Sequence, residues 1–205
     1  MIYYTEMLDI DIKQLQHDCI ELSKKIENDI IGPQELRKYS GHPSMCTAAA
    51  PYYNLFTYTK KSIFNLQKKI RKSFYEKLGD DKYDYWIQGW LNYWPKAGDT
   101  LGWHGHQNDH IENCWHGVVG VNCNDTFAEY RTQKTKDLCG RVENWNRQLL
   151  ISQSWDMQHR ISDWKNKKEP RITIAFNIQP IETLHEDKWI GAKEIDRSWN
   201  YYVAL

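Results

Sequence analysis

The chain changes character at Tyr83, and this change constrains the fold more than any other feature of the sequence. From there to Pro180, short runs of aromatic and β-branched residues are separated by clusters of Gly, Pro, Asn and Asp, which is the pattern of short strands joined by turns. The runs include YDYWIQGWLNYW, HGVVGVNC, TFAEYR, RQLLIS and RITIAFNI. The pattern predicts a β-rich core over residues 83–180.

Two helices are predicted before this core. Apolar residues recur at steps of three and four from Ile12 to Ile30 and stop before Gly32-Pro33, which predicts a helix at about residues 9–30. A second apolar stripe lies opposite a face of Lys and Arg and consists of Ile63, Leu66, Ile70, Phe74 and Leu78. It predicts a second helix that packs against a sheet. The segment 41–51 has no usable period and is expected to be a loop.

The length of 205 residues and the lack of a linker-like stretch favour a single domain over 1–205. In this organisation a helical region, 1–80, supports the strand core, 83–180, and a C-terminal extension, 181–205, follows. Lys plus Arg (27) equal Asp plus Glu (27), so no general electrostatic signal for nucleic acid or an anionic membrane is present.

The five cysteines are scattered and form no C-x-x-C pair, so neither a disulfide framework nor a thiolate zinc site is expected. The N-terminal residues do not form a signal peptide, and no apolar run approaches the roughly 18 residues of a membrane span. We therefore expect a soluble, cytoplasmic protein, and its oligomeric state stays unknown.

The segment GDTLGWHGH, residues 98–106, is the first candidate for chemistry. His104 and His106 are two residues apart, so on an extended strand both imidazoles point to the same side and can chelate one ion. Imidazole suits Fe, Zn, Cu and Ni, so the spacing does not select the metal. The same H-x-H pair also occurs in polar surface turns, so a third ligand must decide.

Two other ligand sets stay open around this segment. His104 could pair with Asp109, or His110 could pair with Glu112, because H-x-E has the same spacing on an extended strand. The histidines that fit no ligand pattern are expected to be surface or packed residues; these are His17, His42, His116 and His185.

The run RITIAFNI is the second candidate, and it begins twelve residues after His159. With a period of two, its Ile and Phe residues face one way, and Arg171 and Thr173 face the other way together. A guanidinium fork beside a hydroxyl is a good receptor for a carboxylate, such as that of a dicarboxylic cosubstrate. The alternative for Arg171 is a structural ion pair with an Asp or Glu.

The order H-x-H, then a distal histidine, then R-x-T, over residues 93–180, resembles the 2-oxoglutarate and Fe(II)-dependent oxygenase superfamily. It is most similar to the phage and bacterial branch that resembles prolyl hydroxylases. Gly98-Asp99, the HGVVGV strand and Phe176-Asn177 belong to the match, which covers somewhat less than half of the chain. The sequence departs from the family pattern at His106, which occupies the place of the usual carboxylate ligand. Asp109, or the pair His110 and Glu112, could restore the missing negative charge.

The resemblance implies a double-stranded β-helix, a jelly-roll or cupin-like all-β core flanked by helices. It implies that His104, His106 and His159 bind Fe(II) as catalytic metal ligands, and that 2-oxoglutarate rests on Arg171 and Thr173. By analogy Tyr93, in GWLNYWP, hydrogen-bonds the cosubstrate, or else is a core tyrosine. With O2, the implied reaction is hydroxylation with release of succinate and CO2.

The substrate is an unidentified small molecule or peptide. The tryptophans around the H-x-H segment would suit a planar or peptide substrate, although core packing explains most of them. Two rival functions use the same barrel: a cupin-type metal-binding protein or isomerase without 2-oxoglutarate, and a non-catalytic binding module. Oxygen-dependent succinate release with Fe(II) distinguishes the oxygenase from both.

Overall fold

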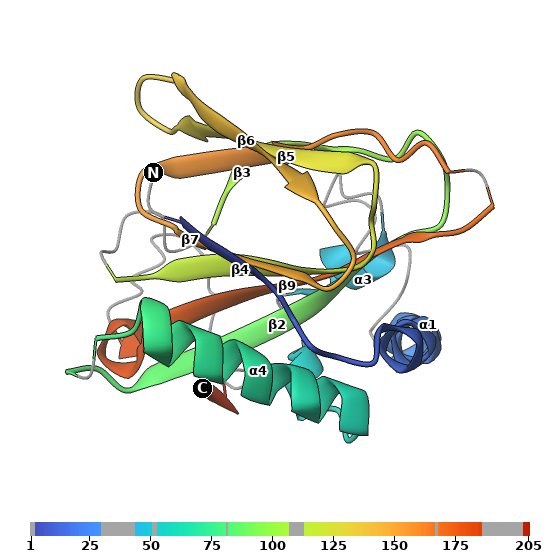
Figure 1. Cartoon of the computed structure of the whole chain (residues 1–205), viewed down its shortest axis with the longest axis horizontal. Coiled ribbons are helices and arrows are strands. Elements are labelled where there is room, and N and C mark those ends of the chain that lie inside the picture. The colour runs from blue at the N-terminus through green and yellow to red at the C-terminus, as the bar shows by residue number, and fades with distance from the viewer. Residues whose placement is uncertain are drawn as a thin grey trace.

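The computed structural model describes residues 3–29, 44–50, 53–80, 82–106, 113–166, 168–185 and 203–205. Its strands form two antiparallel sheets that lie one above the other (Figure 1). The large sheet has the order β1 (Tyr3–Met7), β7 (Gln148–Gln153), β4 (Trp115–Asn122), β9 (Arg171–Pro180), β2 (Tyr85–Trp94) and β10 (Val203–Ala204). The small sheet has the order β3 (Leu101–Gly105), β8 (Met157–Ile161), β5 (Thr126–Thr132) and β6 (Leu138–Asn144).

The path of the chain between the sheets identifies the architecture. From β2 to β9 every connection crosses from one sheet to the other, except the β5–β6 hairpin, whose strands are neighbours in the small sheet. Two packed antiparallel sheets linked in this way form a jelly-roll sandwich. The β-rich core predicted for residues 83–180 is therefore confirmed as a jelly roll.

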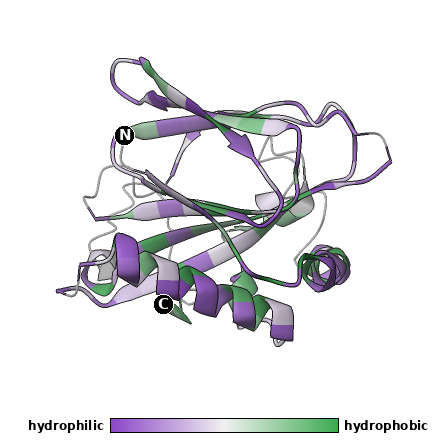
Figure 2. Cartoon of the chain, viewed as in Figure 1, coloured by the Kyte–Doolittle hydropathy of each residue, from purple (hydrophilic) through white to green (hydrophobic). Residues whose placement is uncertain are grey.

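The two predicted helices are confirmed as α1 (Ile12–Asp29) and α4 (Lys61–Lys77). Helix α1 begins later than predicted because Asp11 caps it: the Asp11 carboxylate accepts a hydrogen bond from the Gln14 backbone N–H. Figure 2 shows hydrophobic and hydrophilic residues alternating around α4, as an amphipathic helix on a sheet requires. No helix within the described residues is both long enough and apolar enough to cross a lipid bilayer.

The segment 41–51, predicted as a loop, contains a four-residue helix in its described part, α3 (Met45–Ala48). One helical turn is too short to show a hydrophobic period, so sequence spacing could not reveal it. Two short 3-10 helices are also present, η2 (Leu55–Thr57) and η3 (Ile181–His185). Residues 41–43 and 51, and the predicted C-terminal extension from 186 to 202, lie outside the described residues.

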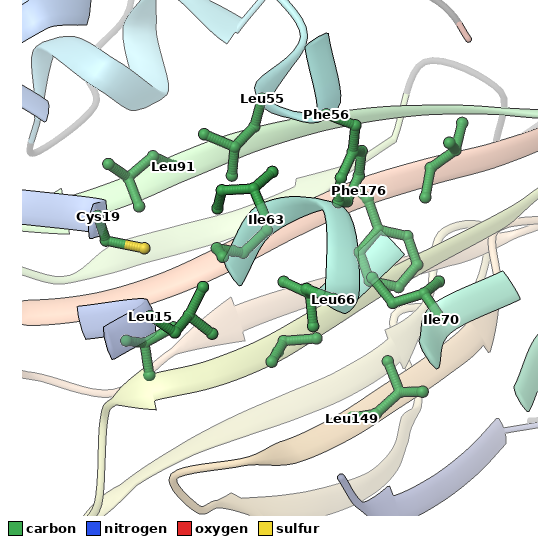
Figure 3. Packing of buried hydrophobic residues seen from close by; sticks show 14 of the residues in the cluster. Leu15, Cys19, Leu55, Phe56, Ile63, Leu66, Ile70, Leu91, Leu149 and Phe176 are labelled. Atoms are coloured by element: carbon green, nitrogen blue, oxygen red, sulfur yellow. The ribbon is translucent and has the colours of Figure 1, made fainter. Parts of the chain in front are cut away.

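The main hydrophobic core lies between the helices and the outer face of the large sheet, where Leu66 and Ile70 of α4 meet Phe176 of β9 (Figure 3). Gly117 is required there, because a Cβ at this position would overlap the Phe176 ring. The predicted apolar face of β9 is confirmed, since all its members belong to this core: Ile172, Ile174, Phe176 and Ile178. The inner face of β9, which points toward the small sheet, carries polar residues at every position except Ala175; these are Arg171, Thr173, Asn177 and Gln179.

Candidate functional site

Three of the predicted site residues converge where β3 and β8 pair. His104 on β3 lies directly across from His159 on β8, with 4.2 Å between the ring centroids. His106 follows the end of β3, and its ring centroid is 5.1 Å from that of His159. One possible ligand nitrogen from each of the three lies within 4.8 Å of the other two. The structure therefore brings the H-x-H pair and the distal histidine together.

Hydrogen bonds orient two of these imidazoles. Nδ1 of His104 lies 2.8 Å from the Gly102 carbonyl oxygen, and Nδ1 of His106 lies 2.7 Å from Oδ1 of Asn177. A carbonyl oxygen only accepts, so each Nδ1 must carry the proton and each Nε2 keeps its lone pair. This is the arrangement by which proteins present Nε2 to a metal ion.

Burial disfavours the charged forms of His106 and His159. Burial lowers the pKa of His106 from its ordinary value of 6.5 to about 3, and the nearby His104 lowers it further while the Asn177 bond opposes the shift. Burial also holds the pKa of His159 well below its ordinary value. Nε2 of His106 and Nδ1 of His159 are buried without a partner among the described residues. The neutral imidazoles of His106 and His159, each with one unpaired buried nitrogen, fit a transition-metal ion such as iron or zinc.

Arg171 begins β9 as a buried cation without a described counter-ion. It is 1% exposed, and its guanidinium carbon lies 4.4 Å from the Trp94 ring centroid. Its Nε has no partner within the described residues, and none of the carboxylates described there forms an ion pair with it. Burial lowers the pKa of Arg171 to about 10, so it is charged at neutral pH. The site therefore fits an external anion better than the structural ion pair considered above.

Thr173 is placed beside Arg171 by a chain of hydrogen bonds. Its Oγ1 accepts from Nη1 of Arg171 and from Nδ2 of Asn92, each at 3.3 Å. Oδ1 of Asn92 in turn accepts from Oγ1 of Thr47, on α3, at 2.8 Å. Since Thr173 Oγ1 already accepts two bonds, its own proton remains to be donated. A carboxylate held by Arg171 can receive that third bond.

Tyr93 does not join this site. It pairs with Ile172 on β9, while its neighbour Trp94 pairs with Arg171. Side chains alternate between the faces of a strand, so Tyr93 points to the helix-covered face and packs against the main core. The analogy with a cosubstrate-binding tyrosine is therefore corrected: Tyr93 is a core tyrosine, and Trp94 takes the inner position.

The remaining alternatives are only partly covered by the structure. Asp109, His110, Glu112 and His42 lie outside the described residues, as does the side chain of His185. His17 is exposed on α1, where its Nε2 lies 3.4 Å from a Glu21 carboxylate oxygen. It therefore takes no part in the cluster around His104.

Sequence reasoning missed two residues of the site, His116 and the role of Asn177. His116 is 3% exposed on β4 and lies opposite Asn177 of β9 in the strand register. Its ring stacks on that of His106, with centroids 4.2 Å apart and planes 11° apart. The only sequence signal was the polar start of HGVVGV, which shows no ligand spacing. The contact depends on strand pairing, which spacing along one segment does not reveal.

No protein-family profile matches the chain, and no curated protein matches it in sequence. Several solved structures share its fold. The apo form of the non-heme monooxygenase ThoJ aligns with a TM-score of 0.55 at 11% identity, over 87% of this chain and 74% of that chain. A Trichoplax adhaerens prolyl hydroxylase, in complex with a hypoxia inducible factor oxygen degradation domain peptide fragment, aligns with a TM-score of 0.54 at 9% identity, over 88% and 84%. SnoN, a non-heme alpha ketoglutarate dependent epimerase from nogalamycin biosynthesis, aligns with a TM-score of 0.54 at 9% identity, over 87% and 76%.

Proposed function

We propose that the chain is a non-haem Fe(II) and 2-oxoglutarate-dependent dioxygenase on a double-stranded β-helix. It would hydroxylate an unidentified small-molecule or peptide substrate. The observation that carries this proposal is the buried guanidinium of Arg171, which lacks a described counter-ion and lies on the same face of β9 as Asn177, the partner of His106. A cupin-type metal protein without 2-oxoglutarate, or a non-catalytic module, leaves that buried charge without a role.

His104, His106 and His159 are the residues that would hold the iron. When bound, Fe(II) with 2-oxoglutarate and O2 supplies an oxidation in which one oxygen atom enters a substrate C–H bond and the other enters succinate, with release of CO2. Three neutral imidazoles leave the centre one charge more positive than two imidazoles and a carboxylate would. This extra charge favours the binding of a dianion.

Arg171 and Thr173 are the residues that would bind the distal carboxylate of 2-oxoglutarate. The guanidinium fork donates N–H groups, and the Thr173 hydroxyl donates a further bond. The guanidinium carbon of Arg171 lies 4.4 Å from the Trp94 ring centroid, so the ring adds a cation–π contact to the buried cation. These groups orient the cosubstrate before reaction, which is the main contribution that a protein makes to cofactor chemistry.

The fold supports the proposal. Of the solved structures with this fold, SnoN is named as alpha ketoglutarate dependent and another is a prolyl hydroxylase. The residues proposed for the site come from, or directly follow, strands of both sheets of the jelly roll, β3 and β8 of the small sheet and β9 of the large sheet.

The test measures 2-oxoglutarate binding to the Co(II)-loaded protein by calorimetry, together with O2-dependent succinate formation by the Fe(II)-loaded protein. Arg171→Ala removes charged hydrogen bonds and should weaken 2-oxoglutarate binding by about 30-fold or more. Affinity for Co(II) should change by less than about threefold, because Arg171 lies outside the predicted ligand set. Arg160→Ala is the matched control, since Arg160 is 50% exposed and pairs with Glu129.

Two results would overturn the proposal. The first is a wild-type protein that binds Co(II) but neither binds 2-oxoglutarate nor releases succinate. The second is an Arg171→Ala protein that binds 2-oxoglutarate as tightly as the Arg160→Ala control. A loss of Co(II) affinity in Arg171→Ala would assign Arg171 to the structure of the metal centre instead.

A further inference from the structure

A fourth imidazole lies against two of the three converging histidines. The His116 ring is parallel to that of His106 and also lies 5.0 Å from that of His159, with 20° between their planes. The set of three histidines with mutually close ligand nitrogens does not include His116. His116 therefore contacts two predicted metal ligands without belonging to the set.

The stacking geometry shows why His116 cannot share an ion with His106. The lone pair of an imidazole nitrogen lies in the plane of its ring. Two rings stacked face to face, 11° from parallel, direct their lone pairs along nearly parallel planes, which do not meet on one ion. The role of His116 must therefore come from its own nitrogens or from its flat face.

The nitrogens of His116 point to a hydrogen-bonding role. Oγ of Ser154 lies 3.5 Å from Nδ1 of His116, within reach of a weak bond that the hydroxyl can donate. With Nδ1 as the acceptor, the ring proton is on Nε2, which becomes a donor. Nε2 is buried and has no partner among the described residues. A buried donor without an acceptor costs free energy, so an acceptor is expected when the site is loaded.

We propose that His116 is a ligand-contacting residue whose Nε2–H donates a hydrogen bond to the anion that binds the metal beside the His104, His106 and His159 set. The contact of His116 with both His106 and His159 places it next to such an anion. The proposal rests on the proposed function only for the identity of that anion as 2-oxoglutarate. A simple anion on the metal would meet the same donor.

The experiment uses the Co(II)-loaded full chain and titrates it with azide and, separately, with 2-oxoglutarate, following the visible absorption of Co(II). His116→Phe keeps a flat ring against His106 but removes the hydrogen-bond donor. The affinity for azide and the affinity for 2-oxoglutarate should each fall by about tenfold. His116→Gln retains an N–H near the position of Nε2 and should stay within about threefold of wild type. Affinity for Co(II) should change by less than about threefold in both variants.

His17→Phe is the control, because His17 is exposed on α1 and belongs, with Asp18 and Glu21, to a group of possible ligands separate from the cluster around His104. Should His116→Phe not fold, as judged by thermal melting, His116→Asn replaces it, since its shorter amide reaches the place of Nδ1 but not that of Nε2. A lower anion affinity for His116→Asn than for His116→Gln then shows that the donor at the place of Nε2 is needed.

The idea is overturned if the variant without the donor binds azide as tightly as wild type, which would leave His116 as a stacking support. It is also overturned if Co(II) affinity falls together with anion affinity, or if the wild-type protein binds no anion on Co(II). Azide binding that depends on His116, without any 2-oxoglutarate binding, would refute the proposed function and retain this inference.

Discussion

Oδ1 of Asn177 accepts a 2.7 Å hydrogen bond from Nδ1 of His106, and Asn177 lies on the same face of β9 as Arg171 at the start of the strand. One strand therefore carries both the partner of a predicted metal ligand and the predicted carboxylate receptor. β9 is buried along its whole length and is paired with β2 on one edge and β4 on the other. A strand held on all sides keeps the two halves of the site at a constant separation.

The Asn177 bond predicts a specific loss of metal affinity. Asn177→Leu removes the acceptor that orients His106, so Co(II) affinity should fall by about 10- to 100-fold, the usual range for such supporting partners. Asn177→Asp keeps an acceptor oxygen and should retain affinity within about threefold of wild type. Calorimetric titration with Co(II) makes the comparison. Equal affinities for the Leu and Asp variants would contradict an orienting role.

Arg171 predicts a conflict between stability and function. Its buried, unpaired charge costs free energy in the ligand-free protein, so Arg171→Met should raise the free energy of unfolding by about 1 kcal/mol while it abolishes measurable 2-oxoglutarate binding. Urea unfolding of the ligand-free proteins measures the first effect. Arg160→Met, on the exposed side of β8, should change stability by less than about 0.5 kcal/mol. A clear loss of stability in Arg171→Met would make Arg171 a structural residue.

Because Tyr93 and Thr173 lie on different faces of the large sheet, removing their hydroxyls should affect 2-oxoglutarate affinity differently. Tyr93→Phe removes a hydroxyl on the helix-covered face, so 2-oxoglutarate affinity should stay within about twofold of wild type. Thr173→Val removes the hydroxyl beside Arg171 and should weaken binding by about tenfold. Both affinities are measured by calorimetry on Co(II)-loaded protein. A larger loss of 2-oxoglutarate affinity in Tyr93→Phe than in Thr173→Val would show that the cosubstrate binds on the helix-covered face of the sheet.

The buried histidines predict that the metal-free protein loses stability as the pH falls. The pKa of His106 is lowered from 6.5 to about 3, and burial, with the neighbouring His104, also holds the pKa values of His116 and His159 well below the ordinary value. Below pH 6.5 the unfolded chain therefore binds protons that the folded protein does not bind. Each of these histidines then lowers the free energy of unfolding by up to about 1.4 kcal/mol per pH unit.

Urea unfolding of EDTA-treated protein at pH 7, 6 and 5, as test conditions about one unit apart, measures this slope. His116→Phe should reduce the slope by one proton's share. A free energy of unfolding that is constant over this range would refute neutral burial of the cluster.

Much of the fold followed from local spacing. The apolar stripes of α1 and α4 and the alternation along β9 are each visible within one segment, because a helix or strand repeats its faces at a constant period. α3 was not visible because one turn contains no period. The bounds of α1 differed where the Asp11 cap, a local hydrogen bond, decided the first turn.

The sequence by itself determined which side chains share a face of one strand, and so it placed Thr173 beside Arg171 and separated both from the isoleucines of β9. Only the tertiary structure decided which strands are neighbours and in which register. That pairing set His159 opposite His104, stacked His116 on His106 and turned Tyr93 toward the helices. The physical reason is that a shift of one residue between paired strands moves every side chain to the other face, and the register depends on packing across the whole sandwich.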